Sequence, residues 1–421
     1  MFTRQLVAAA LLCALLPIHR PAAAGPSPDP GVVIEWNQLA QATIPASAGP
    51  LAMRYYAILH VAMFDAANSI TGRYTPFKTA LSAPSGASAE AAAAQAAHNV
   101  LVALIPAEKA RYRAALDARL ANLPTGAVQD GIAIGKTVAY RTLKWRANDG
   151  IFGPPIPFAL PQLPGMWQPA VPGGQPFQTQ LPAAVPFTME SVTQFLVPRH
   201  PELTSERYAR DFEEVRLIGA RASTTRTATQ TQAAQLFASV ITGTNNFNIW
   251  NNVARDVVLA KKLSLTEAAR LFAFLDTTMM DSLLGTQTGK FIYGLWRPRT
   301  AIPGAADDLN PATTADPAWQ PLLATPPYPS YPGNMAGLGA CAAEALATGT
   351  GSDEFAISAT WVGAPPNANV TRQYSSFWQL AQEQADSRIY GGLHYRFENE
   401  ASQLACLKLV QHAYAKLMLK R

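Results

Sequence analysis

The sequence predicts an all-α protein built from two packed helical bundles. Its 421 residues are 49% apolar and only 14% charged, a composition that favours a well-buried fold over disorder. Apolar residues recur at helical spacing along much of the chain, and no stretch alternates for long enough to predict a β-strand. A chain of this length exceeds one compact core, so we expect two packed domains or one large pseudo-symmetric domain.

Residues 1–24 have the pattern of a signal peptide. Arg4 precedes a short apolar run, Leu6–Leu16, and three alanines ending at Ala24 supply the small residues of a cleavage site. The apolar run is about 11 residues long, which is too short to cross a bilayer. No other stretch reaches transmembrane length without charge or proline. We therefore expect a secreted or periplasmic protein with no membrane span.

Residues 25–152 are expected to form an N-terminal helical bundle. Its first helix has a continuous apolar stripe, formed by Leu51, Tyr55, Leu59 and Met63. The second helix has Ser88 as its N-cap and stops at Pro106. Two more helical patterns cover about 108–121 and 128–148.

Residues 153–203 are expected to form a strap without regular structure. Between Gly153 and Pro186 the strap is dense in proline, glycine and aromatic residues, and each proline fixes φ and removes a backbone donor. Long connections of this kind are usually functional or link domains. Trp167 and Phe177 are candidates for contact with an organic substrate, and packing is their simpler role.

Residues 204–421 are expected to form a C-terminal helical bundle. Four helical patterns begin near Thr204, at Ser264, after Asn334 and near Phe397. For the first of them, Thr204 or Ser205 is the expected N-cap. In the second, Ser264 and Glu267 have the spacing of a capping box.

The charges and cysteines restrict the partners and the redox chemistry. The net charge is +5 and the sequence has no basic run, so nucleic acid is not an expected partner. Removal of the signal peptide leaves Cys341 and Cys406, each within an apolar helical pattern. We expect buried free thiols, and their pairing in an oxidising compartment stays open.

Two segments place cationic side chains and a histidine at regular spacing. In "KFIYGLWRPRTAI", Lys290 is followed after six residues by Arg297. The Lys ammonium is a point charge on a flexible stem, and the rigid Arg guanidinium can bind two oxygens at once. In "SRIYGGLHYRFENE", Arg388 is followed after five residues by His394. The glycine pair at 391–392 breaks the helix, which lets His394 turn back towards Arg388.

A third segment, "PPYPSYPGNMAGLG", leads into a helix of small residues. At the start of that helix, Gly333 and Asn334 are expected to offer unpaired backbone N–H groups to an anion. The three segments together predict an oxyanion site.

The three segments resemble the signature of the vanadium-dependent haloperoxidase and type 2 phosphatidic acid phosphatase superfamily. That signature has Lys, six residues and Arg-Pro, then Pro-Ser-Gly-His, then Ser-Arg, five residues and His. The likeness to the bacterial secreted haloperoxidase-like branch extends over nearly the whole mature chain, for example in "VVIEWNQLAQATI" and "LTSERYARDFEEV". The resemblance implies two helical bundles, with the site in the C-terminal one.

The resemblance also implies a role for each site residue. Lys290, Arg297 and Arg388 would bind the oxygens of the oxyanion, and vanadate would be the cofactor. His394 would bond to vanadium in a peroxidase or attack phosphorus in a phosphatase. Vanadate and a phosphoryl-transfer transition state share shape and charge, so one pocket can host both.

The second motif departs from the family pattern. Gly333, Asn334 and Met335 stand where the family has Ser, Gly and His. The missing His is the acid–base group of the family, and a thioether exchanges no proton near neutral pH. A positioned acid or base contributes about 10²–10⁴-fold to rate, so we expect weakened or altered turnover.

Two residues are candidates to replace the lost groups. His200 lies in a loop and is the one histidine expected to be mobile, whereas His60 and His98 lie in apolar helices and are expected to be core residues. Ser330 is the candidate to replace the lost Ser through a shifted turn.

The expected function is vanadate-dependent oxidation of halide by hydrogen peroxide, with an organic acceptor. One alternative is a phosphatase that cleaves phosphate esters through a phosphohistidine at His394, and another is an inactive relative that binds an oxyanion. Helical relatives often pair, so a homodimer is included among the expectations.

Overall fold

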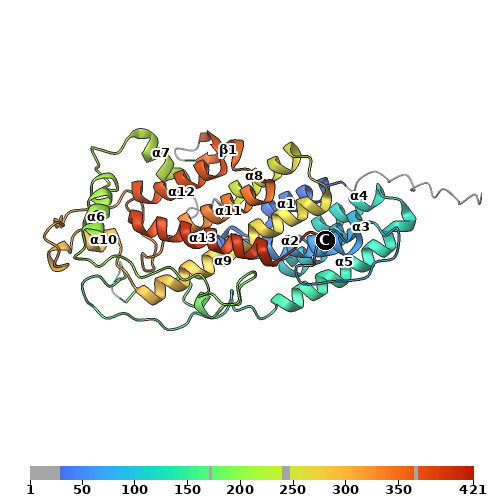
Figure 1. Cartoon of the computed structure of the whole chain (residues 1–421), viewed down its shortest axis with the longest axis horizontal. Helices are drawn as coiled ribbons and strands as arrows, with labels where there is room; N and C mark the ends of the chain where they lie inside the picture. The colour runs from blue at the N-terminus through green and yellow to red at the C-terminus, as the bar shows by residue number, and fades with distance from the viewer. Residues whose placement is uncertain (1–28, 170–172, 239–246, 365–367) are drawn as a thin grey trace, which may run out of the picture.

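A computed structural model describes residues 29–169, 173–238, 247–364 and 368–421, so the predicted signal peptide lies outside the described residues. The molecule is elongated and mostly helical, which confirms the predicted fold class (Figure 1). Its N-terminal helices gather at one end, and helix α9 (Leu265–Tyr293) runs through the middle. None of the helices in the described ranges is long and apolar enough to cross a membrane.

From residue 29 to the strap, the structure has five α-helices: α1 (Gly31–Thr43), α2 (Ala52–Thr71), α3 (Ala89–Leu104), α4 (Lys109–Ala121) and α5 (Thr125–Arg146). Ser88 caps α3 as predicted, because its hydroxyl accepts a hydrogen bond from the Ala91 N–H. Helices α3 and α5 touch through their backbones. A Cβ at Gly131 would lie 2.4 Å from the Ser88 carbonyl oxygen, so only glycine fits there.

The strap has little regular structure, as the prolines predict. Between residues 153 and 186, the described part contains one 3₁₀ turn, Leu181–Ala183, and otherwise neither helix nor strand. The carboxylate of Asp281 in α9 holds the strap by accepting hydrogen bonds from the N–H groups of Phe187 and Thr188. The Trp167 N–H donates to the Gly294 carbonyl at 2.7 Å. The strap therefore lies against the C-terminal end of α9.

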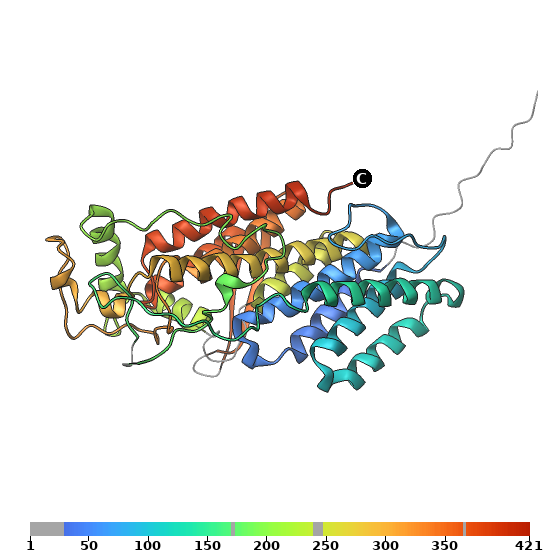
Figure 2. The same ribbon diagram turned by 90° about the horizontal axis from the view of Figure 1, so that it is seen from below.

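The remaining helices are α6 (Glu206–Ile218), α7 (Ala228–Phe237), α8 (Phe247–Ala260), α9, α10 (Pro298–Ala301), α11 (Asn334–Thr350), α12 (Phe377–Tyr390) and α13 (Arg396–Lys416). Ser205 caps α6, and Ser264 with Glu267 forms the predicted capping box at the start of α9. The small-residue helix α11 packs against α9, α12 and α13, and α13 lies along α9 (Figure 2). These four helices surround the site described below.

One β-hairpin corrects the expectation that the chain has no strands. Strand β1 (Glu354–Ala364) pairs antiparallel with β2 (Ala368–Ser376). The buried side chains of β1 are Ile357, Ala359 and Trp361, which alternate with polar residues. This alternation covers only five residues and includes an alanine, so it is weak beside the helical patterns around it.

A disulfide between Cys341 and Cys406 corrects the expectation of free thiols. The two cysteines lie on α11 and α13, whose small side chains let the helices approach until the Cα atoms are 5.0 Å apart. Each helix alone shows only a buried cysteine, and the sequence does not reveal that the two buried faces meet.

Candidate oxyanion site

The ends of five helices meet in the C-terminal half of the molecule. Lys290 lies in the last turn of α9, and Arg297 immediately precedes α10. Gly333 caps the N-terminus of α11, and Arg388 lies in the last turn of α12. His394 follows in the turn that leads to α13. Residues that are up to about a hundred positions apart in the chain are thereby placed in one pocket.

Glycines set the two sharp turns that build the pocket. Gly294 ends α9 in the left-handed region with φ of 63°, and the chain then turns to place Arg297. Gly392 has φ of 75°, and a Cβ there would lie 2.5 Å from the Gly219 carbonyl oxygen. The predicted break at 391–392 is therefore present, and it positions His394.

Three cations and one imidazole are buried together. Lys290, Arg297, Arg388 and His394 are each at most 4% exposed. Burial lowers the pKa of Lys290 well below its ordinary value, and the nearby charges of Arg297 and Arg388 lower it further. Burial also lowers the pKa of Arg388 to about 10. These shifts agree with the contacts of Lys290 and Arg297 on one Tyr328 ring and of Arg297 on His394, which place the predicted groups close together.

The cations bond mainly to backbone carbonyls instead of carboxylates. The Lys290 ammonium donates to the carbonyls of Ser330 and Pro332. Arg297 donates from Nε to the Tyr328 carbonyl at 3.0 Å and from Nη1 to the Leu393 carbonyl at 2.9 Å. Their positive charge is therefore largely uncompensated by the protein.

Two guanidinium N–H groups have no partner among the described residues. Arg297 Nη2 and Arg388 Nε are buried and make no hydrogen bond. An unpaired buried donor of this kind costs about 1–3 kcal/mol, and more when it is charged. An oxyanion with several acceptor oxygens would satisfy both groups, so the donor set fits a tetrahedral anion.

His394 is held as a neutral imidazole whose Nε2 carries a lone pair. Its Nδ1 is hydrogen-bonded to the Glu398 carboxylate, and Arg297 Nη1 donates to its Nε2 at 3.0 Å. Burial and the three surrounding cations lower the pKa of His394 well below its ordinary value. Nδ1 therefore carries the proton, and Nε2 is the nucleophilic or ligating atom.

Glu398 is a site residue that the sequence analysis missed. Burial raises its pKa to about 7, and the charges of Lys290 and Arg297 oppose this rise. Its position four residues after His394 is a signal within the quoted segment, because a residue at the first turn of α13 can reach back to the preceding imidazole. Glu398 orients the ring and fixes its tautomer.

The second motif differs from what the sequence predicts. The Gly333 N–H donates to the Glu398 backbone carbonyl at 3.1 Å, and the Met335 N–H donates to Asn334 Oδ1 at 3.0 Å. A Cβ at Gly333 would lie 2.7 Å from Asn399 Oδ1, so Asn399 occupies the space that a serine there would need. The Gly333 N–H, predicted to bind the anion, is thus already bonded within the protein.

Tyr328 is the second residue that the sequence analysis missed. Its ring centroid lies 5.5 Å from Lys290 Nζ and 5.0 Å from Arg297 Cζ. Its hydroxyl accepts a hydrogen bond from Asn334 Nδ2 at 3.3 Å. Tyrosine has no place in the family signature, so nothing in the motif spacing points to it.

The two candidate replacements occupy different places. His200 is buried with its ring against Tyr293 and Tyr331, and its Nδ1 is 2.9 Å from the Pro201 carbonyl, so the expectation of a mobile histidine is wrong. Ser330 does lie in the pocket, where its hydroxyl interacts with the Glu398 carboxylate and its carbonyl binds Lys290.

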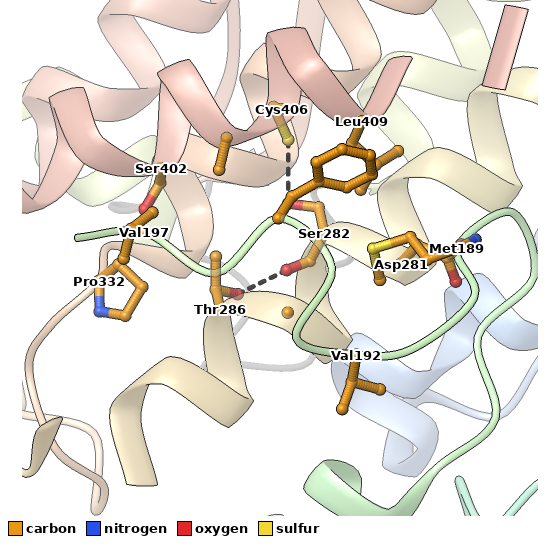
Figure 3. A pocket seen from close by; sticks show the side chains of 13 residues that line it. Met189, Val192, Val197, Asp281, Ser282, Thr286, Pro332, Ser402, Cys406 and Leu409 are labelled. Atoms are coloured by element: carbon orange, nitrogen blue, oxygen red, sulfur yellow. Dashed lines mark hydrogen bonds between the residues drawn. The ribbon is translucent and has the colours of Figure 1, made fainter. Parts of the chain in front are cut away.

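A small apolar cavity of about 20 Å³ lies on the other side of Pro332, between the strap, α9 and α13 (Figure 3). Met189 and Val192 of the strap face Leu409 and Cys406 of α13 across it. The Ser282 hydroxyl lies 3.2 Å from the Cys406 sulfur. None of the three cations lines this cavity, so it is separate from the oxyanion site.

The sequence and the fold both match vanadium haloperoxidases. A family model described as the VCPO second helical-bundle domain matches residues 270–420, which contain the three cations and His394. A vanadium chloroperoxidase of Curvularia inaequalis is 28% identical over 178 residues, or 32% of this chain, and the match spans only 29% of that protein's length.

Solved structures extend the likeness to the whole fold. A bacterial vanadium-dependent iodoperoxidase superposes with a TM-score of 0.77 at 22% identity, covering 93% of this chain and 98% of that one. A holo-type bacterial vanadium-dependent chloroperoxidase gives a TM-score of 0.69 at 16% identity, covering 88% and 92%. Residues 270–420 therefore match a vanadium chloroperoxidase domain in sequence, and the described chain as a whole has the helical fold of bacterial vanadium-dependent haloperoxidases.

Proposed function

We propose that this protein binds vanadate and uses it to oxidise halide with hydrogen peroxide. The observation that carries the proposal is the convergence of three buried cations on the neutral imidazole of His394, with Arg297 Nη2 and Arg388 Nε unpaired. Preorganised donors of this kind favour a tetrahedral oxyanion, because its charge replaces water that the buried site excludes. The relatives named as vanadium peroxidases support this choice of oxyanion.

Lys290, Arg297 and Arg388 would hold the oxygens of vanadate, and His394 Nε2 would be its protein ligand. When bound, vanadate supplies a Lewis-acidic centre that activates hydrogen peroxide towards halide. Arg297 Nη1, which donates to Nε2 in this structure, would instead donate to an oxygen of the anion. Glu398 keeps the proton on Nδ1 throughout, which leaves the lone pair of Nε2 available.

Phosphate ester hydrolysis is the second candidate function. The same neutral Nε2, backed by the Glu398 carboxylate, is a competent nucleophile towards phosphorus. An aryl phosphate has a good leaving group and needs little help from an acid, whereas an alkyl phosphate needs a proton. The absence of an imidazole at Met335 also favours an inactive oxyanion-binding relative.

Vanadate titration, followed by a bromide and peroxide halogenation assay, tests the proposal. We expect wild-type protein to bind vanadate and His394→Ala to lose this binding, with His412→Ala as a control on the last helix. Hydrolysis of p-nitrophenyl phosphate with a trapped phosphohistidine would favour the second function. No vanadate binding by wild type, or binding unchanged in His394→Ala, would contradict the proposal.

We also propose that the protein works outside the reducing cytoplasm. The buried Cys341–Cys406 disulfide supports this location, because such bonds form and persist in oxidising compartments. The sequence pattern of residues 1–24 supports export by the same route. Mass spectrometry of the protein recovered from its host under alkylating conditions tests both, through the thiol count and the N-terminal residue.

A further inference from the structure

The pocket contains a phenol that the proposed mechanism does not yet use. Tyr328 lies in the loop between α10 and α11 and is half-buried. Its backbone carbonyl accepts from Arg297 Nε, and its side chain interacts electrostatically with Arg297 and Arg388. Its ring also faces the Lys290 ammonium at 5.5 Å. The side chain is therefore placed beside all three cations of the site.

The orientation of the Asn334 amide determines what the phenol can donate. Asn334 Oδ1 accepts from the Met335 N–H, so the other amide atom, Nδ2, is the one directed at Tyr328. Because Nδ2 is a donor, the phenol oxygen must accept this hydrogen bond, and the phenol keeps its own proton free. The Asn334 side chain, which the family pattern lacks, thereby holds the Tyr328 hydroxyl as a proton donor.

Two other polar groups of the pocket are already committed to hydrogen bonds within the protein. His394 shares its Nδ1 proton with Glu398, and the Lys290 ammonium donates to two carbonyls. The Ser330 hydroxyl interacts with the Glu398 carboxylate. Met335 exchanges no proton. Tyr328 differs from these groups because its ring lies beside both Lys290 and Arg297, which places its hydroxyl to move a proton to or from a bound oxygen.

We infer that Tyr328 is the proton-transfer residue of this site and replaces the imidazole that is absent at position 335. The inference rests on the proposed function, since it requires an oxyanion between the three cations. Asn334 is the positioning residue, because it orients the hydroxyl without touching the substrate.

The proton balance is the same for both candidate reactions. In ester hydrolysis, His394 Nε2 forms the bond to phosphorus, the bond to the alcohol oxygen breaks, and that oxygen takes the Tyr328 proton. The water that then cleaves the phosphohistidine returns a proton to the phenolate. In halide oxidation, halide, hydrogen peroxide and one proton give hypohalous acid and water, and Tyr328 delivers that proton and regains it from solvent.

The test compares Tyr328→Phe with Tyr331→Phe as a matched control. The Tyr331 hydroxyl donates to the Pro198 carbonyl, and its ring packs against His200. Vanadate affinity, halogenation rate and hydrolysis of p-nitrophenyl and alkyl phosphates are measured for each variant. We expect Tyr328→Phe to bind vanadate within about threefold of wild type while the proton-dependent rates fall by about 10²–10⁴-fold. The alkyl ester is affected more than the aryl ester.

A rescue variant separates proton transfer from packing. Met335→His in the Tyr328→Phe background is expected to restore turnover, because the imidazole supplies the lost proton. Unchanged turnover in Tyr328→Phe, or a parallel loss of vanadate binding, overturns the inference. Wild-type protein that binds vanadate yet turns over no substrate also overturns it. Wild-type protein that binds no vanadate instead overturns the proposed function.

Discussion

Replacement of Glu398 by glutamine tests how the ligating nitrogen is prepared. Above about pH 7, where Glu398 is ionised, its carboxylate can only accept a hydrogen bond from the protonated Nδ1 of His394, so the lone pair stays on Nε2. A glutamine amide can also donate to Nδ1, which moves the ring proton to Nε2 and removes the lone pair. Glu398→Gln therefore weakens the attachment of vanadate without removing any of the three cations.

The magnitude follows from the kind of hydrogen bond that is lost. A buried hydrogen bond to a charged group contributes about 1.5–3 kcal/mol, and loss of a ligand's supporting carboxylate usually lowers metal affinity about 10–100-fold. We expect the vanadate affinity of Glu398→Gln to fall in that range. Sulfate affinity should change much less, because sulfate contacts the cations but takes no bond from Nε2.

Stability should change in the opposite direction to affinity. Burial raises the pKa of Glu398 from 4.5 to about 7, so the folded protein holds this proton more tightly than the unfolded chain. The Glu398 contribution to the free energy of unfolding is fully present below about pH 4.5 and is lost as the pH rises through about 7. We therefore expect Glu398→Gln to unfold at a higher urea concentration than wild type above pH 7.

Isothermal titration with vanadate and with sulfate, on wild type and both variants, provides the assay. Glu400→Gln is the matched control, since Glu400 lies on the same helix with an exposed side chain that pairs with Arg207. Wild-type vanadate affinity in Glu398→Gln would refute the tautomer argument. An equal loss of vanadate and sulfate affinity would also refute it, because it would show that the substitution damages the cation pocket.

Three further substitutions test the pocket and its frame. Lys290→Met should raise the free energy of unfolding by about 1 kcal/mol and remove stabilisation by vanadate. The reason is that burial lowers the pKa of the Lys290 ammonium, so the wild type gains stability as the pH rises through that lowered pKa. Urea denaturation with and without vanadate measures both effects. Gly333→Ser should lower stability by about 1–3 kcal/mol because its Cβ meets Asn399 Oδ1, and Asn399→Ala should relieve this loss in thermal unfolding. Replacing both Cys341 and Cys406 by serine should lower the free energy of unfolding by about 4 kcal/mol, because the disulfide closes a loop of 65 residues in the unfolded chain. A decrease below about 1 kcal/mol in denaturant unfolding would contradict this.

Local sequence patterns predicted the helices and the cationic residues well. Ser88 and Ser264 mark helix starts through contacts within one turn, so their caps follow from neighbouring residues alone. Lys290 and Arg297 are separated only by the end of one helix and one turn. This short spacing restricts the relative positions of their two side chains. The glycine break before His394 is local in the same way.

Glu398 could have been found from its local spacing to His394, whereas the other missed features depend on contacts between distant segments. The Cys341–Cys406 disulfide and the contact of Gly333 with Asn399 exist because α11 and α13 lie side by side. The alignment of Tyr328 with the cations depends on a loop whose path is set by the carbonyls that bind Lys290 and Arg297. Periodicity along the chain carries no information about such neighbours.

The hydrogen bond from Arg297 to His394 Nε2 has a consequence for adventitious metals. A buried neutral imidazole would ordinarily attract zinc or nickel from the surroundings. Here the positive side chains of the site would repel such a cation. Two unit charges about 4 Å apart repel each other by about 4 kcal/mol at the effective dielectric of a protein. The site therefore selects metals by net charge. It favours a metal oxyanion and excludes a free metal cation.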